Sequence, residues 1–156
     1  MLVGEPLEFL KRFFTPRTVF MDVAAGNCSL ALSAASYVER VYAVEASEVP
    51  GRARMPCNLK LVPADGIAHG SVDIAYSAQL RLRGTHELAR IHRSLAPGGT
   101  FFCGAGGGYS ARQIREVFLR AGFSAVRLYA GVGGGFVRIP LVLEKLFGSL
   151  RIAAVK

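Results

Sequence analysis

The chain has 156 residues, of which 51% are hydrophobic and 19% charged, and its mean hydropathy is +0.34. This length gives room for one domain with a substantial core, and the composition excludes a disordered chain. The formal net charge of +8 leaves a nucleic acid or another polyanion open as a partner, although no aromatic residues interleave with the basic clusters at 50–56 and 81–83 to form a base-stacking surface.

Seven apolar runs, rich in β-branched and aromatic residues, predict strands along the chain. They cover residues 18–23, 40–46, 59–65, 71–77, 100–105, 124–132 and 150–156. Segments with helical spacing precede or separate several of these strands. They are residues 7–14, residues 29–39, the stretch from Thr85 as N-cap to the stop at Pro97-Gly98-Gly99, and a helix that follows the capping box of Ser110 and Gln113 and ends at Gly122.

Two connections differ from this alternation. Residues 47–58 contain Pro50, Gly51 and Pro56 and predict mostly loop, and residues 133–149 predict a loop with a short helix. Strands that alternate with helices predict an α/β fold with a doubly wound, mainly parallel sheet. The last two strands lie close in sequence and predict an antiparallel C-terminal edge strand. We expect residues 1–156 to form a single domain.

Acidic and small residues follow four of the predicted strands, at the ends where ligands bind in such sheets. They are Asp22, Ala24, Gly26 and Cys28 around the end of the first strand, Glu45 and Ala46 after the second, Asp65 and Gly66 after the third, and Ser77 at the end of the fourth. Small residues let the backbone approach a ligand, and the helix that follows offers free N–H groups. A carboxylate at Glu45 can accept both hydroxyls of a ribose, and Asp65 can accept an adenine amino group.

These motifs resemble those of the class I S-adenosylmethionine-dependent methyltransferases. The stretch "FMDVAAGNCSLAL" is similar to their first motif, and "VYAVEAS" to their second, with Glu45 in the ribose-binding position. "LVPADGIAHGSVDIAYS" looks like the adenine-binding Asp and the fourth-strand motif, and "ELARIHRSLAPGGTFF" like the helix and turn before strand five. The resemblance covers about 18–156 and implies a Rossmann-like fold, a core at 18–103 that binds S-adenosylmethionine, a C-terminal helix and hairpin at 110–156, and an unidentified methyl acceptor.

The sequence departs from the family pattern at several positions. Ala24 and Cys28 stand where the first motif commonly has glycine, and we expect the Cys28 side chain to crowd the amino-acid part of the cofactor and weaken its binding. Prolines interrupt the helix after Glu45, and few residues precede the first strand. These departures favour an alternative, an inactive methyltransferase-like scaffold that binds a protein or nucleic acid, with 136–148 as a docking surface.

A dinucleotide-binding oxidoreductase is a further alternative, because "TFFCGAGGGYSARQI" joins a strand, a glycine-rich turn and a capped helix. The strand that follows ends without the acidic residue that would hold a ribose, which argues against this alternative. Methyl transfer depends mainly on alignment, and a general base is needed only where the acceptor loses a proton. His86, at a helix start, and Tyr76 are the candidate catalytic residues, although solvation and packing also account for them. His92 is expected at a helix surface.

The three cysteines, Cys28, Cys57 and Cys103, form no CxxC pair and argue against a disulfide framework or a metal site. The N-terminus has no apolar h-region, and no uncharged apolar run approaches the ~18 residues of a membrane span. We therefore expect a cytoplasmic protein without a metal or a membrane span. The sequence leaves the oligomeric state open.

Overall fold

The computed structural model describes residues 4–48, 51, 55–78, 85–104, 110–132, 135–140 and 150–156. The helices are α1 (Gly4–Leu10), α2 (Ser29–Ala34), α3 (Thr85–Ser94) and α4 (Ala111–Arg120). The strands are β1 (Val19–Asp22), β2 (Arg40–Val44), β3 (Leu59–Val62), β4 (Val72–Ser77), β5 (Leu95–Gly104), β6 (Ala125–Val132), β7 (Gly135–Ile139) and β8 (Leu150–Val155).

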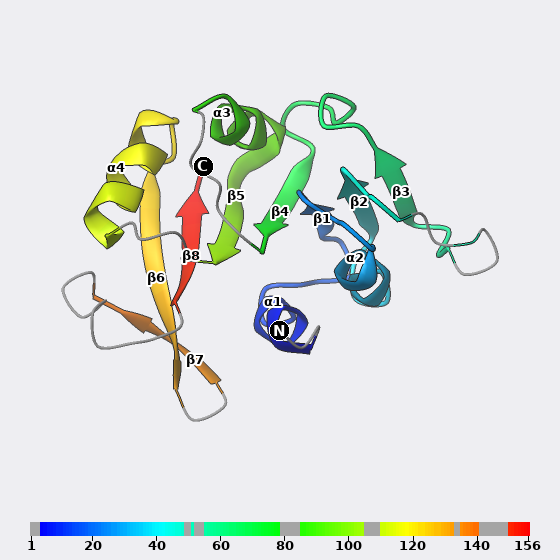
Figure 1. Cartoon of the computed structure of the whole chain (residues 1–156), viewed down its shortest axis with the longest axis horizontal. Helices are drawn as coiled ribbons and strands as arrows, with labels where there is room; N and C mark the ends of the chain where they lie inside the picture. Colours follow the sequence, from blue (N-terminus) through cyan, green and yellow to red (C-terminus); the bar gives the residue numbers. More distant parts are fainter. Residues whose placement is uncertain are drawn as a thin grey trace.

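All eight strands belong to one sheet with the order β3-β2-β1-β4-β5-β8-β6-β7 (Figure 1). The β3-β2-β1-β4-β5 part is parallel, whereas β8 pairs antiparallel with both β5 and β6, and β7 pairs antiparallel with β6. The predicted fold class, a mainly parallel sheet with an antiparallel C-terminal edge, is confirmed. The strand order reverses at β1, because β2 continues the sheet in one direction and β4 in the other.

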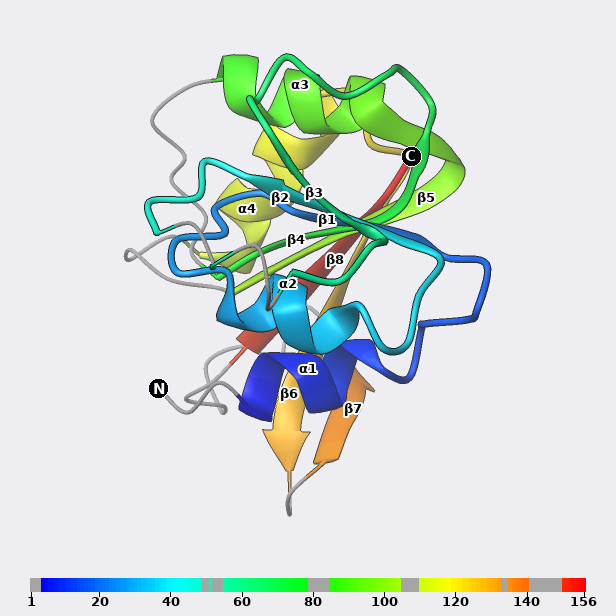
Figure 2. The ribbon, with the colours of Figure 1, turned by 90° about the vertical axis from the view of Figure 1, so that its right-hand side faces the viewer.

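Helices cover both faces of the sheet, α1 and α2 on one and α3 and α4 on the other (Figure 2). The apolar cluster under α1 and α2 includes Phe9 and Phe102, and the cluster under α3 and α4 includes Phe101 and Phe118. Phe101 and Phe102 are consecutive residues of β5 that project to opposite faces. Strands buried on both faces account for the nearly continuous apolar runs in the sequence.

Helices α1 and α3 differ from their predicted extents. Helix α1, predicted at 7–14, ends at Leu10, where Phe13 N donates to the Leu10 carbonyl at 2.9 Å and closes a turn. Helix α3 ends at Ser94, so Pro97-Gly98-Gly99 lies inside β5 and does not mark the helix stop. Four residues of β5 stand opposite one residue of β4 at this point, because the register shifts between the two strands. The extra residues form an irregular entry to the strand.

Helix α2 is also shorter than predicted, because it ends at Ala34 and not at residue 39. Asn58, which precedes β3, donates its side-chain Nδ2 to the carbonyls of Ala35 at 2.9 Å and Val38 at 3.1 Å. These carbonyls bond to a side chain from a distant part of the sequence, so the helix does not continue. The end of α2 is therefore set by tertiary contact.

Strand β7 stands where the sequence predicted loop and a short helix. It pairs with β6 from Leu128↔Ile139 to Val132↔Gly135, as a hairpin. Glycines between two apolar runs are a hairpin signal that the prediction did not use. The remaining residues of that prediction, 141–149, lie outside the described part of the chain, as do the 81–83 basic cluster and the glycine-rich turn at 105–109.

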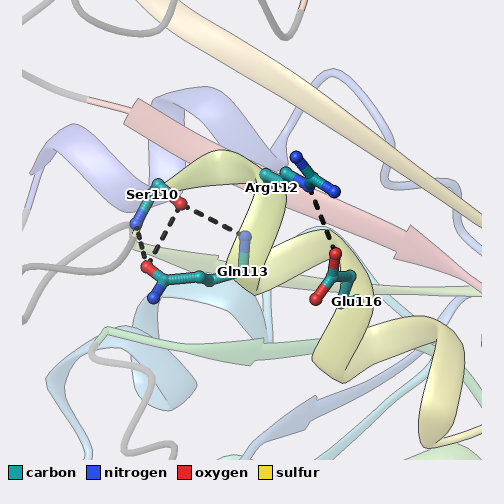
Figure 3. Close-up of polar contacts among 4 residues, drawn as sticks. All are labelled: Ser110, Arg112, Gln113 and Glu116. Carbon is teal, nitrogen blue, oxygen red and sulfur yellow. Dashed lines mark hydrogen bonds and ion pairs between the residues drawn. The ribbon is translucent and has the colours of Figure 1, made fainter.

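The N-terminus of α4 has the predicted capping box (Figure 3). Gln113 N donates to Ser110 Oγ at 3.3 Å, and Ser110 N donates to Gln113 Oε1 at 2.9 Å. The two bonds satisfy backbone donors that the helix itself cannot pair. On the exposed face, Arg112 Nε lies 3.3 Å from Glu116 Oε1, a surface pair that contributes little to stability.

Helix α4 ends at Arg120 and is closed by a Schellman motif at Gly122, the predicted stop, with φ +101° at the glycine. Gly122 N donates to the Leu119 carbonyl and Phe123 N to the Phe118 carbonyl, both at 3.1 Å. The rings of Phe118 and Phe123 pack edge to face with centroids 5.2 Å apart. His92, expected at a helix surface, packs on Phe123 at 5.1 Å. This end of α4 therefore anchors the helix to α3.

We expect Gly122→Ala to lower the free energy of unfolding by about 1–3 kcal/mol, because φ is left-handed and a Cβ would lie 3.2 Å from His92 Cε1. Urea unfolding measures the loss. Gly98→Ala is the matched control, because Gly98 has φ +76° but its Cβ would meet nothing within 4 Å. An equal loss in both variants would contradict the contribution of the His92 contact.

Candidate functional site

The parallel strands bring the predicted cofactor-binding residues to one edge of the sheet. The carboxyl ends of β3, β2, β1 and β4 are neighbours there, and Asp22 at the end of β1 pairs with Ala43 on one side and Tyr76 on the other. The predicted residues stand at or just after these ends: Asp22, Ala24, Gly26, Cys28, Glu45, Ala46, Asp65, Gly66 and Ser77. Asp22 and Ser77 are buried, whereas Glu45 and Asp65 are exposed to solvent.

Backbone hydrogen bonds hold the loop after β1 to both neighbouring strands. On the β4 side, Val23 N donates to the Tyr76 carbonyl at 2.8 Å. On the β2 side, Ala25 N donates to the Val44 carbonyl at 2.9 Å. The position of Gly26, the next residue, is therefore set by the sheet, since the loop cannot move without breaking these bonds.

Three residues of this edge have a left-handed backbone: Gly26 (φ +52°), Cys28 (φ +61°) and Glu45 (φ +53°). Cys28 and Glu45 are the non-glycine residues with positive φ in the part of the chain that the structure describes. Such a conformation costs about 1–3 kcal/mol, and it is found where the surrounding structure imposes it, frequently at functional sites. Gly26 forms a parallel bridge with Ala46, next to Glu45, so the strained residues lie together.

The carboxylate of Asp22 is buried at the centre of this edge, with 4% of the residue exposed. Burial raises the pKa of Asp22 to about 7. Among the described residues, no group donates a hydrogen bond to this carboxylate. A buried acceptor without donors is unfavourable, and a ligand that carries N–H or O–H groups would supply the missing partners.

Cys28 is fully buried, and its side chain belongs to the apolar cluster under α1 and α2. Its Sγ donates to the Glu48 carbonyl at 3.6 Å, and burial together with the charge of Asp22 raises the pKa of the thiol. The expectation that Cys28 crowds the cofactor assumes that its side chain points into the space that the ligand would occupy. The structure gives that side chain a place in the core, and the effect of Cys28 on binding stays a prediction.

The two candidate catalytic residues lie in different surroundings. Tyr76 is 1% exposed, and its side chain packs in the cluster under α1 and α2. His86 is exposed in the first turn of α3, which covers the opposite face of the sheet. The structure thus places Tyr76 in a packing position, whereas His86 is open to solvent.

A separate hollow of about 400 Å³ lies at the amino end of β1, away from the predicted site. Its lining comes from the segments that follow α1 and α2: Lys11, Phe14, Thr15, Pro16, Ser36, Tyr37 and Val38. Within the described ranges, no three His, Cys, Asp or Glu side chains gather as metal ligands. No helix in those ranges is both long and apolar enough to cross a membrane.

Sequence reasoning missed a buried arginine, Arg151 on β8, which is 8% exposed. It pairs with Gly104 at the carboxyl end of β5, next to the end of β4. The sequence does indicate this residue, because Arg151 is the one charged residue within the otherwise apolar run 150–155. A charge in such a run is costly to bury and therefore points to a specific role.

Solved structures of S-adenosylmethionine-dependent methyltransferases have the same fold as this chain. A SAM-dependent methyltransferase from Thermotoga maritima has a TM-score of 0.69 at 14% identity, over 99% of this chain and 89% of the other. Burkholderia thailandensis 1,6-didemethyltoxoflavin-N1-methyltransferase was solved with 1,6-didemethyltoxoflavin and S-adenosylhomocysteine bound. It has a TM-score of 0.70 at 20% identity, over 99% of this chain and 77% of the other.

A third similar structure is the complex between the Haloferax volcanii Trm112 methyltransferase activator and a proposed methyltransferase, with a TM-score of 0.68 at 18% identity, over 95% of this chain and 86% of the other. No family model and no curated protein matches the sequence. The chain therefore has the methyltransferase fold, and these identities establish nothing finer than the fold.

Asp22→Asn should change how stability depends on pH. The folded pKa of about 7 lies above the ordinary value of 3.8, so the folded state keeps a proton that the unfolded state releases. Wild type therefore loses stability as pH rises from about 4 to 7, by up to about 4 kcal/mol, and stays at that lower level above pH 7.

The variant should lack this loss, so its advantage in urea unfolding should grow across that pH range. Asp65→Asn, which removes an exposed carboxylate, is the control, and its stability should depend on pH as that of wild type does. Parallel stability curves for wild type and Asp22→Asn would show that Asp22 is not a buried acid without partners.

Proposed function

We propose that this chain binds S-adenosylmethionine at the carboxyl ends of β1, β2 and β3 and transfers its methyl group to an acceptor. The observation that carries the proposal is the buried carboxylate of Asp22, which has no donor among the described residues. It lies beside a loop in which Gly26 and Cys28 have left-handed backbones. Methyl donors of this class carry an ammonium group and ribose hydroxyls, which are the donors that such carboxylates accept.

The residues present fit this cofactor. A Cβ built on Gly26 would have its first neighbour at 4.0 Å, so the bare backbone there is open to a ligand. Glu45, exposed and held at φ +53° beside that loop, would accept the ribose diol, and Asp65 would accept the adenine amino group. When bound, the cofactor supplies a methyl group on a sulfonium for direct displacement.

The chain's own contribution to such a reaction is to hold the donor and orient the acceptor. A general base enters only for an acceptor that must lose a proton, and the exposed His86 is the candidate that remains open to solvent. The chain would act as one methyltransferase-like domain, because all eight strands form one sheet. The alternative of an inactive scaffold draws no support from the similar structures, and the fold does not identify the acceptor.

Glu45→Ala should weaken S-adenosylhomocysteine binding by at least about tenfold, because two charge-assisted hydrogen bonds to the ribose are lost, each contributing roughly 1.5–3 kcal/mol at most. Calorimetric titration measures the affinity. Stability should hardly fall, since the side chain is exposed.

Glu48→Ala is the matched control, because it removes an exposed carboxylate three residues away in the same segment. Its affinity should equal that of wild type. Unchanged affinity in Glu45→Ala would contradict the ribose assignment, and an equal loss in both variants would indicate a general effect of negative charge.

A further inference from the structure

In the antiparallel half of the sheet, β8 lies between β5 and β6 (Figure 1). The register of these strands brings a row of residues together at the carboxyl edge. Tyr129 on β6 pairs directly with Arg151 on β8 and with Arg138 on β7, and Arg151 pairs with Gly104 at the end of β5. Directly paired residues project from the same face. This is the α1 face, because Tyr129 packs on Phe9 with ring centroids 5.5 Å apart.

Arg151 is the buried cation of this row, with 8% exposed, whereas Arg138 is exposed at the rim. A Cβ built on Gly104 would lie 3.3 Å from Arg151 Nη1 and 2.6 Å from the carbonyl oxygen of Ala78. The guanidinium therefore lies over the end of β5, where the missing side chain of Gly104 leaves room for it beside the residue that follows β4.

The surroundings of the row carry positive charge. Strands β5, β6, β7 and β8 contain no acidic residue, and their cations Arg127, Arg138 and Arg151 all project from the α1 face by strand alternation and register. Helix α1 carries two acidic residues, Glu5 and Glu8, and Glu8 is paired with Lys11 at 2.6 Å. Arg138 and Arg151 lie at the carboxyl edge, and Arg127 lies two residues inside it. The three arginines outnumber Glu5, so this face of the sheet carries net positive charge.

This row lies beside the proposed cofactor site on the same edge of the sheet. The strand order β1-β4-β5 puts β5 two strand spacings, about 10 Å, from β1 and Asp22. We infer that Arg151 binds an anionic group of the methyl acceptor, a carboxylate or a phosphate, while the exposed Arg127 and Arg138 attract the acceptor to this face. This inference rests on the proposed function and adds the substrate class.

The chemistry of the guanidinium suits this role. It carries five N–H donors in a planar fork, a geometry in which one guanidinium can bond a protein neighbour and an oxyanion together. Because Arg151 is buried, an ion pair that it forms with an anion is stronger than the same pair formed by an exposed lysine. One buried guanidinium beside a glycine fits a single anionic group of a small acceptor better than a polyanion, which needs several exposed cations.

The test is a titration of the ¹⁵N-labelled full chain with inorganic phosphate, followed through backbone amide shifts. We expect saturable shifts at Gly104 and at the start of β8. Arg151→Gln should raise the phosphate Kd by at least about tenfold. Arg138→Gln should raise it by about threefold, because an exposed charge contributes less. Arg115→Gln is the matched control, an exposed arginine on α4 at the opposite face, and should leave the Kd unchanged.

If Arg151→Gln does not fold, Arg138→Gln still tests the inference. Residue 138 is exposed, so its substitution should leave folding intact. Equal effects of Arg115→Gln and Arg138→Gln, or shifts spread over α3 and α4, would overturn the inference in favour of general surface charge. Tighter binding of a single-stranded oligoribonucleotide, with steep salt dependence and equal losses in all three variants, would overturn it in favour of a nucleic-acid partner.

S-adenosylhomocysteine binding is measured separately on the same samples. A chain that binds phosphate at Gly104 but does not bind S-adenosylhomocysteine contradicts the proposed function and the acceptor role, while the anion site itself stands. A chain that binds S-adenosylhomocysteine but shows no phosphate shifts overturns this inference alone.

Discussion

The backbone hydrogen bonds that tie the loop after β1 to β2 and β4 fix the rest of the candidate site. Val23 bonds to the strand on one side and Ala25 to the strand on the other, so the chain must turn sharply between two fixed points. Gly26 and Cys28, which follow this turn, and Glu45, which follows β2, have left-handed conformations. Because strained backbone persists only where its surroundings impose it, the parallel pairing of β1 is what maintains the site's shape.

The same pairing explains the electrostatics of the edge. An interior strand of a sheet covered on both faces has a buried end, and Asp22 stands at that end of β1 with its pKa raised to about 7. The exposed carboxylates Glu45 and Asp65 follow strands nearer the sheet's margin. The edge thus combines one buried acid with two solvated ones. Beyond β4 the edge carries a positive group instead, because the Arg151 guanidinium lies over the end of β5.

Much of this arrangement could be predicted from the sequence, for a physical reason. Parallel strands buried on both faces must be apolar throughout, so their ends are visible wherever a charged or small residue stops the run, as at Asp22 and Glu45. The parts that could not be predicted depend on distant contacts. Asn58 ends α2, and pairing with β6 makes a strand of residues that also suited a loop. The core position of the Cys28 side chain and the placement of Arg151 also follow from tertiary packing, which local pattern does not encode.

The most direct test of the account is a calorimetric titration of the full chain with S-adenosylhomocysteine at pH 7, in two buffers of different ionisation enthalpy, with NAD as the control ligand. The account predicts saturable binding of S-adenosylhomocysteine and none of NAD. It also predicts release of a proton on binding, because an ammonium donor beside Asp22 lowers the raised pKa of that carboxyl. Absence of binding at millimolar S-adenosylhomocysteine, or equal binding of NAD, would contradict the account.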